Sequence, residues 1–336
     1  MDIYFVSRKA FSKWRSIEAK NTAFVDQHPE EFRSGVDVWI AQTFLRVREP
    51  LAALGIFCRF SDHFIPGKIC IAHRDDLNDF FGGAYRSFVV GIRADRPPLY
   101  ICQQEVRQNN LLPDTPERHY LRHWPQPGLV SRNPGRGNML KTVGYLGRDS
   151  AAPNWFRGSE LRDALQKLGV SFEIRTKAWY DYSDIDVLLA YRDELPLMFR
   201  HKPATKLYNA WLAGVPALLS NEPAFAGIRN SELDYIPVHN MDNVCAAIQR
   251  LKTDPVLYRN MIEHGARRAR DYTVAAISAQ WVNFICDSVL PAYKIWQARD
   301  ASRRTRLLGK FAVHMVRQKL AAKLFRRGIE FGYPIK

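Results

Sequence analysis

Short apolar runs alternate with helical segments along this chain, and this alternation limits the folds available to it. In the N-terminal third, six runs suit buried strands: Ile3–Val6, Val36–Ile40, Ile56–Phe60, Lys68–Ala72, Phe88–Ile92 and Leu99–Cys102. Helical periodicity is clearest in Thr43–Leu54. Strands that alternate with helices form a largely parallel sheet covered by helices. The sequence therefore predicts an α/β unit in this part of the chain.

The alternation is interrupted by two clusters of Pro and Gly, at 123–128 and 133–138, which predict a linker or long loop. It then starts again. The expected strands are Thr142–Leu146, Val170–Ile174, Asp186–Tyr191, Val215–Leu219 and Tyr235–Val238. The expected helices are Gly158–Leu168, Ala204–Ala213, Asp242–Lys252, Pro255–Arg270 and Thr273–Leu290. A length of 336 residues fits about two domains, and ligands of such sheets bind beyond the carboxyl ends of the strands.

Basic charge is concentrated at the C-terminus. The chain has 49 Lys and Arg against 34 Asp and Glu, and residues 301–336 hold ten of the former and one acid, Glu330. On a helix, a sector of about 100° would hold Leu307, Leu308, Phe311 and Met315. This composition favours contact with an anionic membrane surface. The alternatives are a helix packed on the body of the protein and nucleic-acid binding, for which no recognised motif is present.

Membrane-spanning and secreted classes are not indicated. No stretch approaches the roughly 18 uninterrupted apolar residues of a membrane span, and the run Ile3–Val6 is too short for the core of a signal peptide. We therefore expect a cytoplasmic protein. Its five cysteines are scattered and form no CxxC pair, so neither a disulfide framework nor a zinc site is expected.

The segment from His201 to Ser220 contains the most informative motif. Pro203 suits the start of a helix, and Lys202, Thr205 and Lys206 cluster at or before its first turn. A helix start attracts anions through its free N–H groups and dipole, and Lys202 and Lys206 would share one helix face. Gly214 is expected to end the helix. The alternative interpretation is a solvated basic helix start.

This motif, K-P-x-x-K-L-x-N-A-x-x-A-G-V-P at 202–216, resembles the nucleotide-sugar-binding segment of GT-B glycosyltransferases of group 1, the family 4-like enzymes. Thr142–Arg148 resembles the first strand of the same domain, which ends in a Gly-Arg turn. The resemblance implies two Rossmann-like, doubly wound α/β domains that face a cleft. Residues 1–135 would bind the acceptor and 140–272 the nucleotide-sugar, followed by a crossover helix at 273–300 and a basic tail at 301–336.

The resemblance also implies which residues bind the donor: Gly147, Arg148, His201, Lys202, Thr205, Lys206, Asn209 and Glu222. Lys202, Lys206 and Arg148 would hold the diphosphate, because cationic side chains suit phosphate oxygens. Many members carry two Glu eight residues apart, where this chain has His201 and Asn209. Asn209 can still hydrogen-bond a ribose hydroxyl. For His201 a structural role, and for Glu222 a position near a helix start, are the alternatives.

The acceptor domain offers His73, Asp75 and Glu105 as candidate catalytic residues, with Asp76 as a further candidate. Each follows an expected strand, and a His or a carboxylate there could act as a general base or hold the acceptor hydroxyl. Surface charge or helix capping is the alternative for each. No Asp-x-Asp motif stands where a metal would sit in the cleft, so no metal and no other cofactor is expected.

The expected function is transfer of a sugar from a nucleoside diphosphate-sugar to an acceptor hydroxyl. The resemblance implies a retaining reaction. The basic tail suggests a saccharide or lipid-linked acceptor at the inner membrane face, as in polysaccharide biosynthesis. Two alternatives stay open: a non-catalytic nucleotide-sugar-binding module of the same fold, and a basic protein associated with nucleic acid. A phosphorylase with a pyridoxal cofactor is disfavoured by the short chain.

Overall fold

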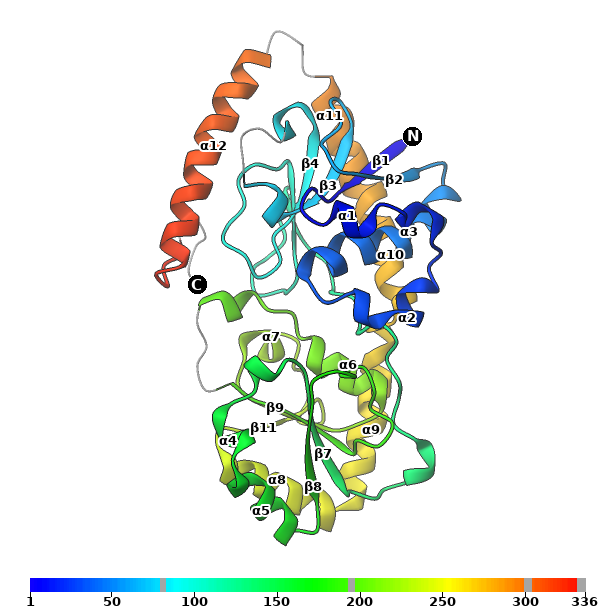
Figure 1. Cartoon of the computed structure of the whole chain (residues 1–336), viewed down its shortest axis with the longest axis vertical. Helices are drawn as coiled ribbons and strands as arrows, with labels where there is room; N and C mark the ends of the chain where they lie inside the picture. The colour runs from blue at the N-terminus through cyan, green and yellow to red at the C-terminus, as the bar shows by residue number, and fades with distance from the viewer. Residues whose placement is uncertain (79–82, 193–196, 299–303, 331–336) are drawn as a thin grey trace. The chain divides into compact units, whose positions relative to one another are not determined.

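The computed structural model describes residues 1–78, 83–192, 197–298 and 304–330. The chain forms two compact units, each built around one sheet (Figure 1). Unit 1 comprises Met1–His123, Pro196–Pro203 and Val274–Lys336, and unit 2 comprises Trp124–Leu195 and Ala204–Thr273. The Pro- and Gly-rich residues expected to link two domains therefore belong to unit 2, and the crossover helix and basic tail belong to unit 1.

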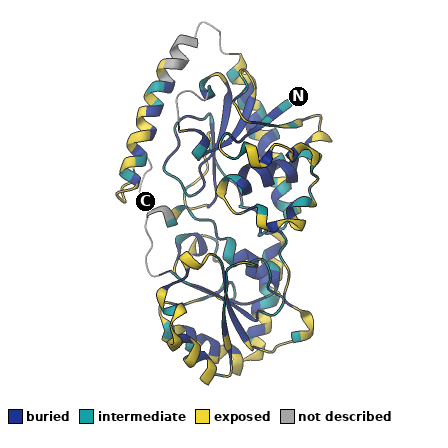
Figure 2. Ribbon diagram, in the orientation of Figure 1, coloured by how far each residue is buried: buried dark blue, intermediate teal, exposed yellow. Residues whose placement is uncertain are grey.

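Unit 1 contains a six-stranded parallel sheet in the order β2-β1-β3-β4-β5-β6. Its strands are β1 (Asp2–Val6), β2 (Phe57–Ser61), β3 (Ile69–His73), β4 (Phe88–Ile92), β5 (Gln104–Arg107) and β6 (Arg118–Tyr120). The central strands β3 and β4 are buried along their whole length, as their continuous apolar runs predict. Figure 2 shows these strands as the buried centre of the unit.

Two expected strands of unit 1 were wrong. Val36–Ile40 is helical, because residues Asp37–Gln42 form a π-helical segment that continues into α3 (Thr43–Ala52). Leu99–Cys102 is not a strand, and the next strand of the sheet, β5, begins instead at Gln104. Short helices α1 (Phe11–Trp14) and α2 (Phe24–Gln27) precede α3.

Unit 2 contains a five-stranded parallel sheet in the order β11-β10-β9-β7-β8. Its strands are β7 (Thr142–Leu146), β8 (Ser171–Arg175), β9 (Val187–Ala190), β10 (Ala217–Leu219) and β11 (Ile236–Pro237). Its helices are α4 (Asn154–Arg157), α5 (Ser159–Lys167), α6 (Thr205–Ala213), α7 (Pro223–Ala226), α8 (Met241–Thr253) and α9 (Pro255–Ala269). Every strand and helix expected here is present, and the prediction of two doubly wound α/β units is confirmed.

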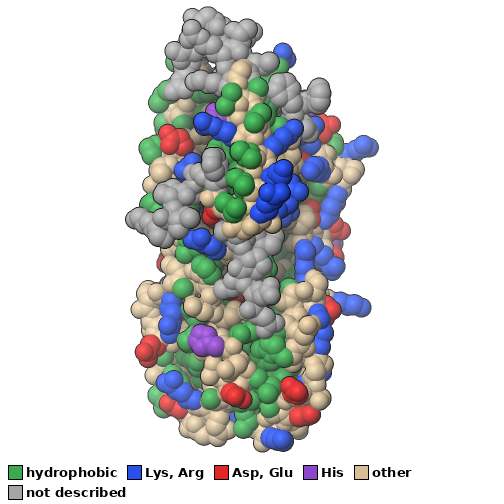
Figure 3. Space-filling view, turned by 90° about the vertical axis from the view of Figure 1, so that its left-hand side faces the viewer, with side chains coloured by type: hydrophobic (Ala, Val, Ile, Leu, Met, Phe, Trp, Pro, Cys, Tyr) green, Lys and Arg blue, Asp and Glu red, His purple; other side chains and the backbone are tan. Residues whose placement is uncertain are grey.

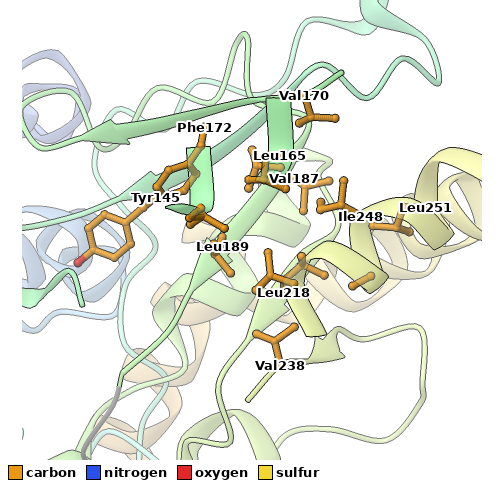
Figure 4. Packing of buried hydrophobic residues seen from close by; sticks show 14 of the residues in the cluster. Tyr145, Leu165, Val170, Phe172, Val187, Leu189, Leu218, Val238, Ile248 and Leu251 are labelled. Carbon is orange, nitrogen blue, oxygen red and sulfur yellow. The ribbon is translucent and has the colours of Figure 1, made fainter. Parts of the chain in front are cut away.

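Alternate residues of each central strand face opposite sides of this sheet, and each side has its own apolar core. Val143 and Val187 join a cluster with residues of α5, α8 and α9, whereas Leu146 and Leu188 join a second cluster with residues of α6 and α7. Figure 4 shows the first cluster, with the hydroxyl of Tyr145 at its margin. Burial on both faces fixes the register of the strands and so the positions of the loops that follow them.

A continuous helical run, Pro255–Gln297, passes from unit 2 into unit 1 and comprises α9, α10 (Val274–Phe284), a π-helical segment at Ile285–Val289 and α11 (Leu290–Gln297). Among the described residues, it is the run whose length and composition would allow a membrane span, with 28% of its most apolar window buried. In unit 1 it is held by polar contacts: Ser278 Oγ donates to the Arg46 carbonyl at 3.2 Å, and Gln280 Nε2 to the Tyr120 carbonyl at 3.1 Å. We interpret this run as a packed helix of the fold.

The basic tail forms α12 (Arg304–Phe325), which continues through Gly309 without a break. Phe311 and Met315 are buried in a cluster with residues of β1, β3 and β4. The side chains of Leu307 and Leu308, expected on the same sector, lie outside the described part of the structure. The part of this apolar sector that the structure describes therefore packs on unit 1.

Candidate functional site

In unit 2 the direction in which successive strands are added to the sheet changes at β7. Strand β8 lies on one side of β7, and the next strand in sequence, β9, lies on the other. The connections after β7 and β9 pack on opposite faces of the sheet, and ligands of such sheets bind outside the carboxyl ends of the strands at this point. The loops that begin at Gly147 and Tyr191 therefore border the default ligand site of this unit.

Lys206, on the first turn of α6, reaches across to the loop that follows β7. Its Nζ donates to the carbonyl of Leu146 and lies 4.5 Å from the centre of the Tyr145 ring. A Cβ atom on Gly147 would lie 2.9 Å from this Nζ. Glycine at position 147 therefore leaves the space that the lysine amine occupies.

The charge of Lys206 is disfavoured where the amine lies. Burial, together with the nearby Arg192 cation, lowers the pKa of Lys206 from 10.5 to about 7, against the opposing effect of Glu222. Burial also raises the pKa of Tyr145 to about 12, so its hydroxyl stays protonated and donates to the Arg148 carbonyl at 3.1 Å. About half of such lysine amines are protonated near pH 7, and a nearby anion would raise the pKa so that the amine becomes fully charged.

Three further polar side chains at this edge follow β9 and β10. Arg192 Nη1 donates to Glu222 Oε2 at 2.7 Å, and the Glu222 side chain is almost fully buried. Ser220 is buried next to them, and its hydroxyl has no hydrogen-bond partner among the described residues. Glu222 was predicted from the sequence, whereas Arg192 and Ser220 were not. Their position directly after the buried strands Val187–Ala190 and Ala217–Leu219 was the signal that could have identified them.

Three other predicted donor residues lie in unit 2. Thr205 begins α6, and its hydroxyl accepts from Tyr208 Oη at 3.1 Å. Asn209 is buried one turn later, and its Oδ1 accepts from the backbone N–H of Gln126 at 3.1 Å. Arg148 is exposed on the loop after β7. The structure therefore brings Gly147, Lys206 and Glu222 to one edge of the sheet and gives Asn209 a backbone partner.

Lys202 and His201 belong to unit 1. The expectation that Lys202 and Lys206 share a helix face was wrong, because α6 begins at Thr205 and the segment before it turns away from the helical path. Lys202 Nζ forms an ion pair with Asp95. Gly214, in contrast, ends α6 in the left-handed conformation, with φ of +73°, as expected.

His201 forms part of a buried charged cluster. Its Nε2 lies 2.9 Å from Glu330 Oε1 and 3.1 Å from Arg93 Nη2, which in turn lies 2.7 Å from the same carboxylate. Burial would raise the pKa of Glu330, but its contacts with His201 and Arg93 lower it to about 2. Burial lowers the pKa of His201, against the opposing effect of Glu330. These contacts favour the structural interpretation of His201.

His73 ends β3 and is buried. Its Nδ1 accepts from the backbone N–H of Asp75 at 3.2 Å, and burial lowers its pKa to about 4. The neutral ring therefore carries its proton on Nε2. This Nε2 has no hydrogen-bond partner among the described residues, and it lies 3.2 Å from where a Cβ on Gly35 would stand. The described geometry makes His73 a hydrogen-bond donor at Nε2, not a general base there.

The other acceptor-side candidates have partners of their own. Arg96 donates to both oxygens of Asp75, at 3.0 and 2.9 Å. Asp76 Oδ1 accepts from the backbone N–H of Lys9 at 3.1 Å, and burial raises the pKa of Asp76. Glu105 does not follow a strand as expected but lies within β5, where it is buried.

Among residues 1–78, 83–192, 197–298 and 304–330, no group of three or more His, Cys, Asp or Glu could hold a metal ion. No protein-family model matches the chain, and no curated protein matches it in sequence. Solved structures match it in fold. HepE from Anabaena, in complex with UDP, matches with a TM-score of 0.54 and 12% identity over 85% of this chain and 100% of that one. Sucrose-phosphate synthase from Thermosynechococcus elongatus matches with a TM-score of 0.52 and 12% identity over 87% and 100%.

The chain has the GT-B fold. A third structure of this fold, HepE in complex with UDP-glucose, matches with a TM-score of 0.53 and 12% identity over 85% of this chain and 100% of that one. The GT-B architecture accounts for the two parallel sheets and for the helical run that leaves unit 2 at Thr273.

Proposed function

We propose that this protein transfers a sugar from a nucleoside diphosphate-sugar to an acceptor hydroxyl. The observation that carries the proposal is the Lys206 amine, held against the backbone of Leu146 and Gly147 at the carboxyl edge of β7. A cation in this place suits a diphosphate, because the leaving nucleoside diphosphate gains negative charge as its bond to the sugar breaks. The complexes of HepE with UDP and with UDP-glucose support UDP-glucose as the first donor to test.

In the proposed mechanism, Lys206 and Arg148 stabilise the departing diphosphate. The Thr205 hydroxyl and the N–H groups of Thr205 and Lys206 at the start of α6 are proposed to add hydrogen-bond donors at the same place. No metal ion or cofactor takes part in this proposal. Lys202 would have to leave its ion pair with Asp95 before it could bind the same group.

The Arg192–Glu222 pair is proposed to contact the donor beyond its diphosphate. Glu222 can accept hydrogen bonds from sugar or ribose hydroxyls, and Arg192 keeps its carboxylate charged and oriented. The unpartnered hydroxyl of Ser220 offers a further contact beside them. Asn209 would reach a ribose through its side-chain NH2 group, since its Oδ1 already accepts a hydrogen bond from Gln126.

Unit 1 is proposed to bind the acceptor, a saccharide or a lipid-linked saccharide. His73 would donate a hydrogen bond from Nε2 to a substrate oxygen and so position that oxygen. Asp75, Asp76 and Glu105 are the carboxylates to test for proton transfer. We propose a retaining reaction, as in the enzymes that the 202–216 motif resembles. A role in polysaccharide biosynthesis at the cytoplasmic face of a membrane, with residues 301–336 at an anionic surface, completes the proposal.

The test is donor binding followed by turnover. We expect UDP-glucose, or another donor from a panel of nucleoside diphosphate-sugars, to raise Tm and to be hydrolysed slowly without acceptor. A ligand at about 100 times its Kd stabilises the folded state by about 2.7 kcal/mol. Lys206→Met should lower the rate about 10- to 150-fold, which corresponds to about 1.5–3 kcal/mol for a charged hydrogen bond.

The matched control is Lys167→Met, because Lys167 is exposed at the last turn of α5, at the opposite edge of the same sheet. This variant should bind and turn over the donor like the wild type. Donor binding with no hydrolysis or transfer would favour a non-catalytic binding module. Wild-type turnover in Lys206→Met would refute the assignment of the site.

A further inference from the structure

One face of helix α12 is used to attach it to unit 1. Phe311 and Met315 are buried in the apolar cluster of that unit. Gln318, which is also buried, donates to the Leu77 carbonyl at 2.6 Å and accepts from the Tyr100 N–H at 3.1 Å. These contacts fix which side of the helix faces away from the unit.

The outward side of α12 carries a second row of apolar side chains. Val313, Val316 and Leu320 are 55%, 67% and 47% exposed, and the partly buried Leu324 continues the row. At about 100° per residue, these four side chains fall within a sector of about 80° on the side away from Phe311 and Gln318. We call them the outer stripe. Its residues are too regular in spacing to be scattered surface positions.

Cations border the outer stripe on both sides. Arg317 lies on one side of it, and Lys319 and Lys323 lie on the other, all exposed. Arg326 and Arg327 follow at the end of the helix, and residues 304–329 include no Asp or Glu. Figure 3 shows this face, with a line of hydrophobic side chains beside a cluster of Lys and Arg.

We propose that the outer stripe and its flanking cations dock α12 on an anionic lipid surface, with the helix axis parallel to the membrane plane. An exposed apolar row bordered only by positive charge suits acidic headgroups above and acyl chains below. The stripe is narrow and consists of small aliphatic side chains, so binding should depend on anionic lipid and weaken with salt. This inference deepens the membrane contact in the proposed function and rests on it.

Deletion of residues 301–336 would not test this proposal. It would expose the apolar cluster that Phe311 and Met315 cover, and it would remove Glu330 from the buried Arg93. Substitutions on the outward side leave those contacts in place. The variants are therefore the double changes Val316→Glu with Leu320→Glu, and Lys319→Glu with Lys323→Glu, in the full chain.

The measurement is co-sedimentation with vesicles of phosphatidylcholine, with and without about a third phosphatidylserine. The control double variant, Val256→Glu with Lys167→Glu, makes the same two kinds of change on exposed sites of unit 2. We expect the wild type and the control to bind the anionic vesicles and not the neutral ones. Both α12 variants should bind at least tenfold more weakly at an unchanged Tm.

Equal binding by the α12 variants, or no binding by the wild type, would overturn the proposal. So would a dimer in light scattering that the Val316→Glu, Leu320→Glu variant abolishes, because the stripe would then face a second copy. The Tm shift caused by UDP-glucose without vesicles reports the donor site separately. A wild type that shows this shift but does not bind anionic vesicles refutes only the docking face, and a wild type that binds the vesicles but shows no shift refutes only the donor site.

Discussion

Lys206 is expected to take up a proton when a nucleoside diphosphate-sugar binds. In the structure, burial and Arg192 lower its pKa to about 7. A bound diphosphate would place negative charge beside the amine and raise this pKa toward the ordinary lysine value. The amine is then charged in the complex at any pH between 6 and 9, whereas in the free protein its charge depends on pH.

The size of the uptake follows from the free-protein pKa. With a pKa of about 7, the amine is neutral in roughly 10% of molecules at pH 6, about 50% at pH 7 and about 90% at pH 8. Binding should therefore take up about 0.1, 0.5 and 0.9 protons at these pH values. By the same linkage, Kd should rise up to tenfold per pH unit above pH 7 and change little below pH 6.

Isothermal titration calorimetry measures this uptake directly. UDP-glucose is titrated at pH 8 in two buffers of different ionisation enthalpy, and the difference in observed heat gives the number of protons. Lys206→Met should bind more weakly and take up no proton, whereas Lys167→Met should behave like the wild type. Tight binding by the wild type with no uptake at pH 8, or equal uptake by Lys206→Met, would refute the reasoning.

Two further perturbations test other parts of the structure. Gly147 has φ of +159°, which L residues rarely adopt, and a Cβ there would lie 2.9 Å from the Lys206 amine and 3.2 Å from Tyr145 Oη. We expect Gly147→Ala to lower Tm and to weaken donor binding in calorimetry, and wild-type values of both would contradict this. Glu330→Gln removes the carboxylate that the buried Arg93 faces and should cost about 3 kcal/mol in urea unfolding. Because the pKa of Glu330 is lowered to about 2, its contribution to the free energy of unfolding is present above about pH 4.5 and lost as pH falls through 2. An equal free energy of unfolding for Glu330→Gln and the wild type at pH 7 would contradict this prediction.

The strands were predictable where burial on both faces leaves a continuous apolar run, as in Phe88–Ile92 and Thr142–Leu146. Val36–Ile40 failed because its alternation of apolar and polar residues imitates a strand. The local signal that decides it is Ser34 and Asp37, whose side chains accept from each other's backbone N–H, each at 3.1 Å. This reciprocal pair marks a helix start and could have been seen in the sequence.

The candidate site was predictable only in part. Residues that follow buried strands, such as Gly147, could be placed because parallel strands end at one edge. The partners of Lys202 and His201 could not be foreseen, because Asp95 and Glu330 are more than a hundred residues away in sequence. For the basic tail, periodicity identifies an apolar sector but not what covers it, and the structure buries Phe311 and Met315 of this sector against unit 1.

The segment Pro196–Pro203 lies in the chain between β9 and α6 but belongs to unit 1, so unit 2 is not one uninterrupted stretch of chain. Gln108 Nε2 donates to the His201 carbonyl, and Asn109 Nδ2 donates to the carbonyls of Arg200 and Lys202. A fragment cut at 124 and 273 would carry this loop without the amides that hold it, three residues before Lys206. A chimaera that contains the sheet of unit 2 must therefore also contain Gln108 and Asn109, or a redesigned loop in place of the one that these two amides hold.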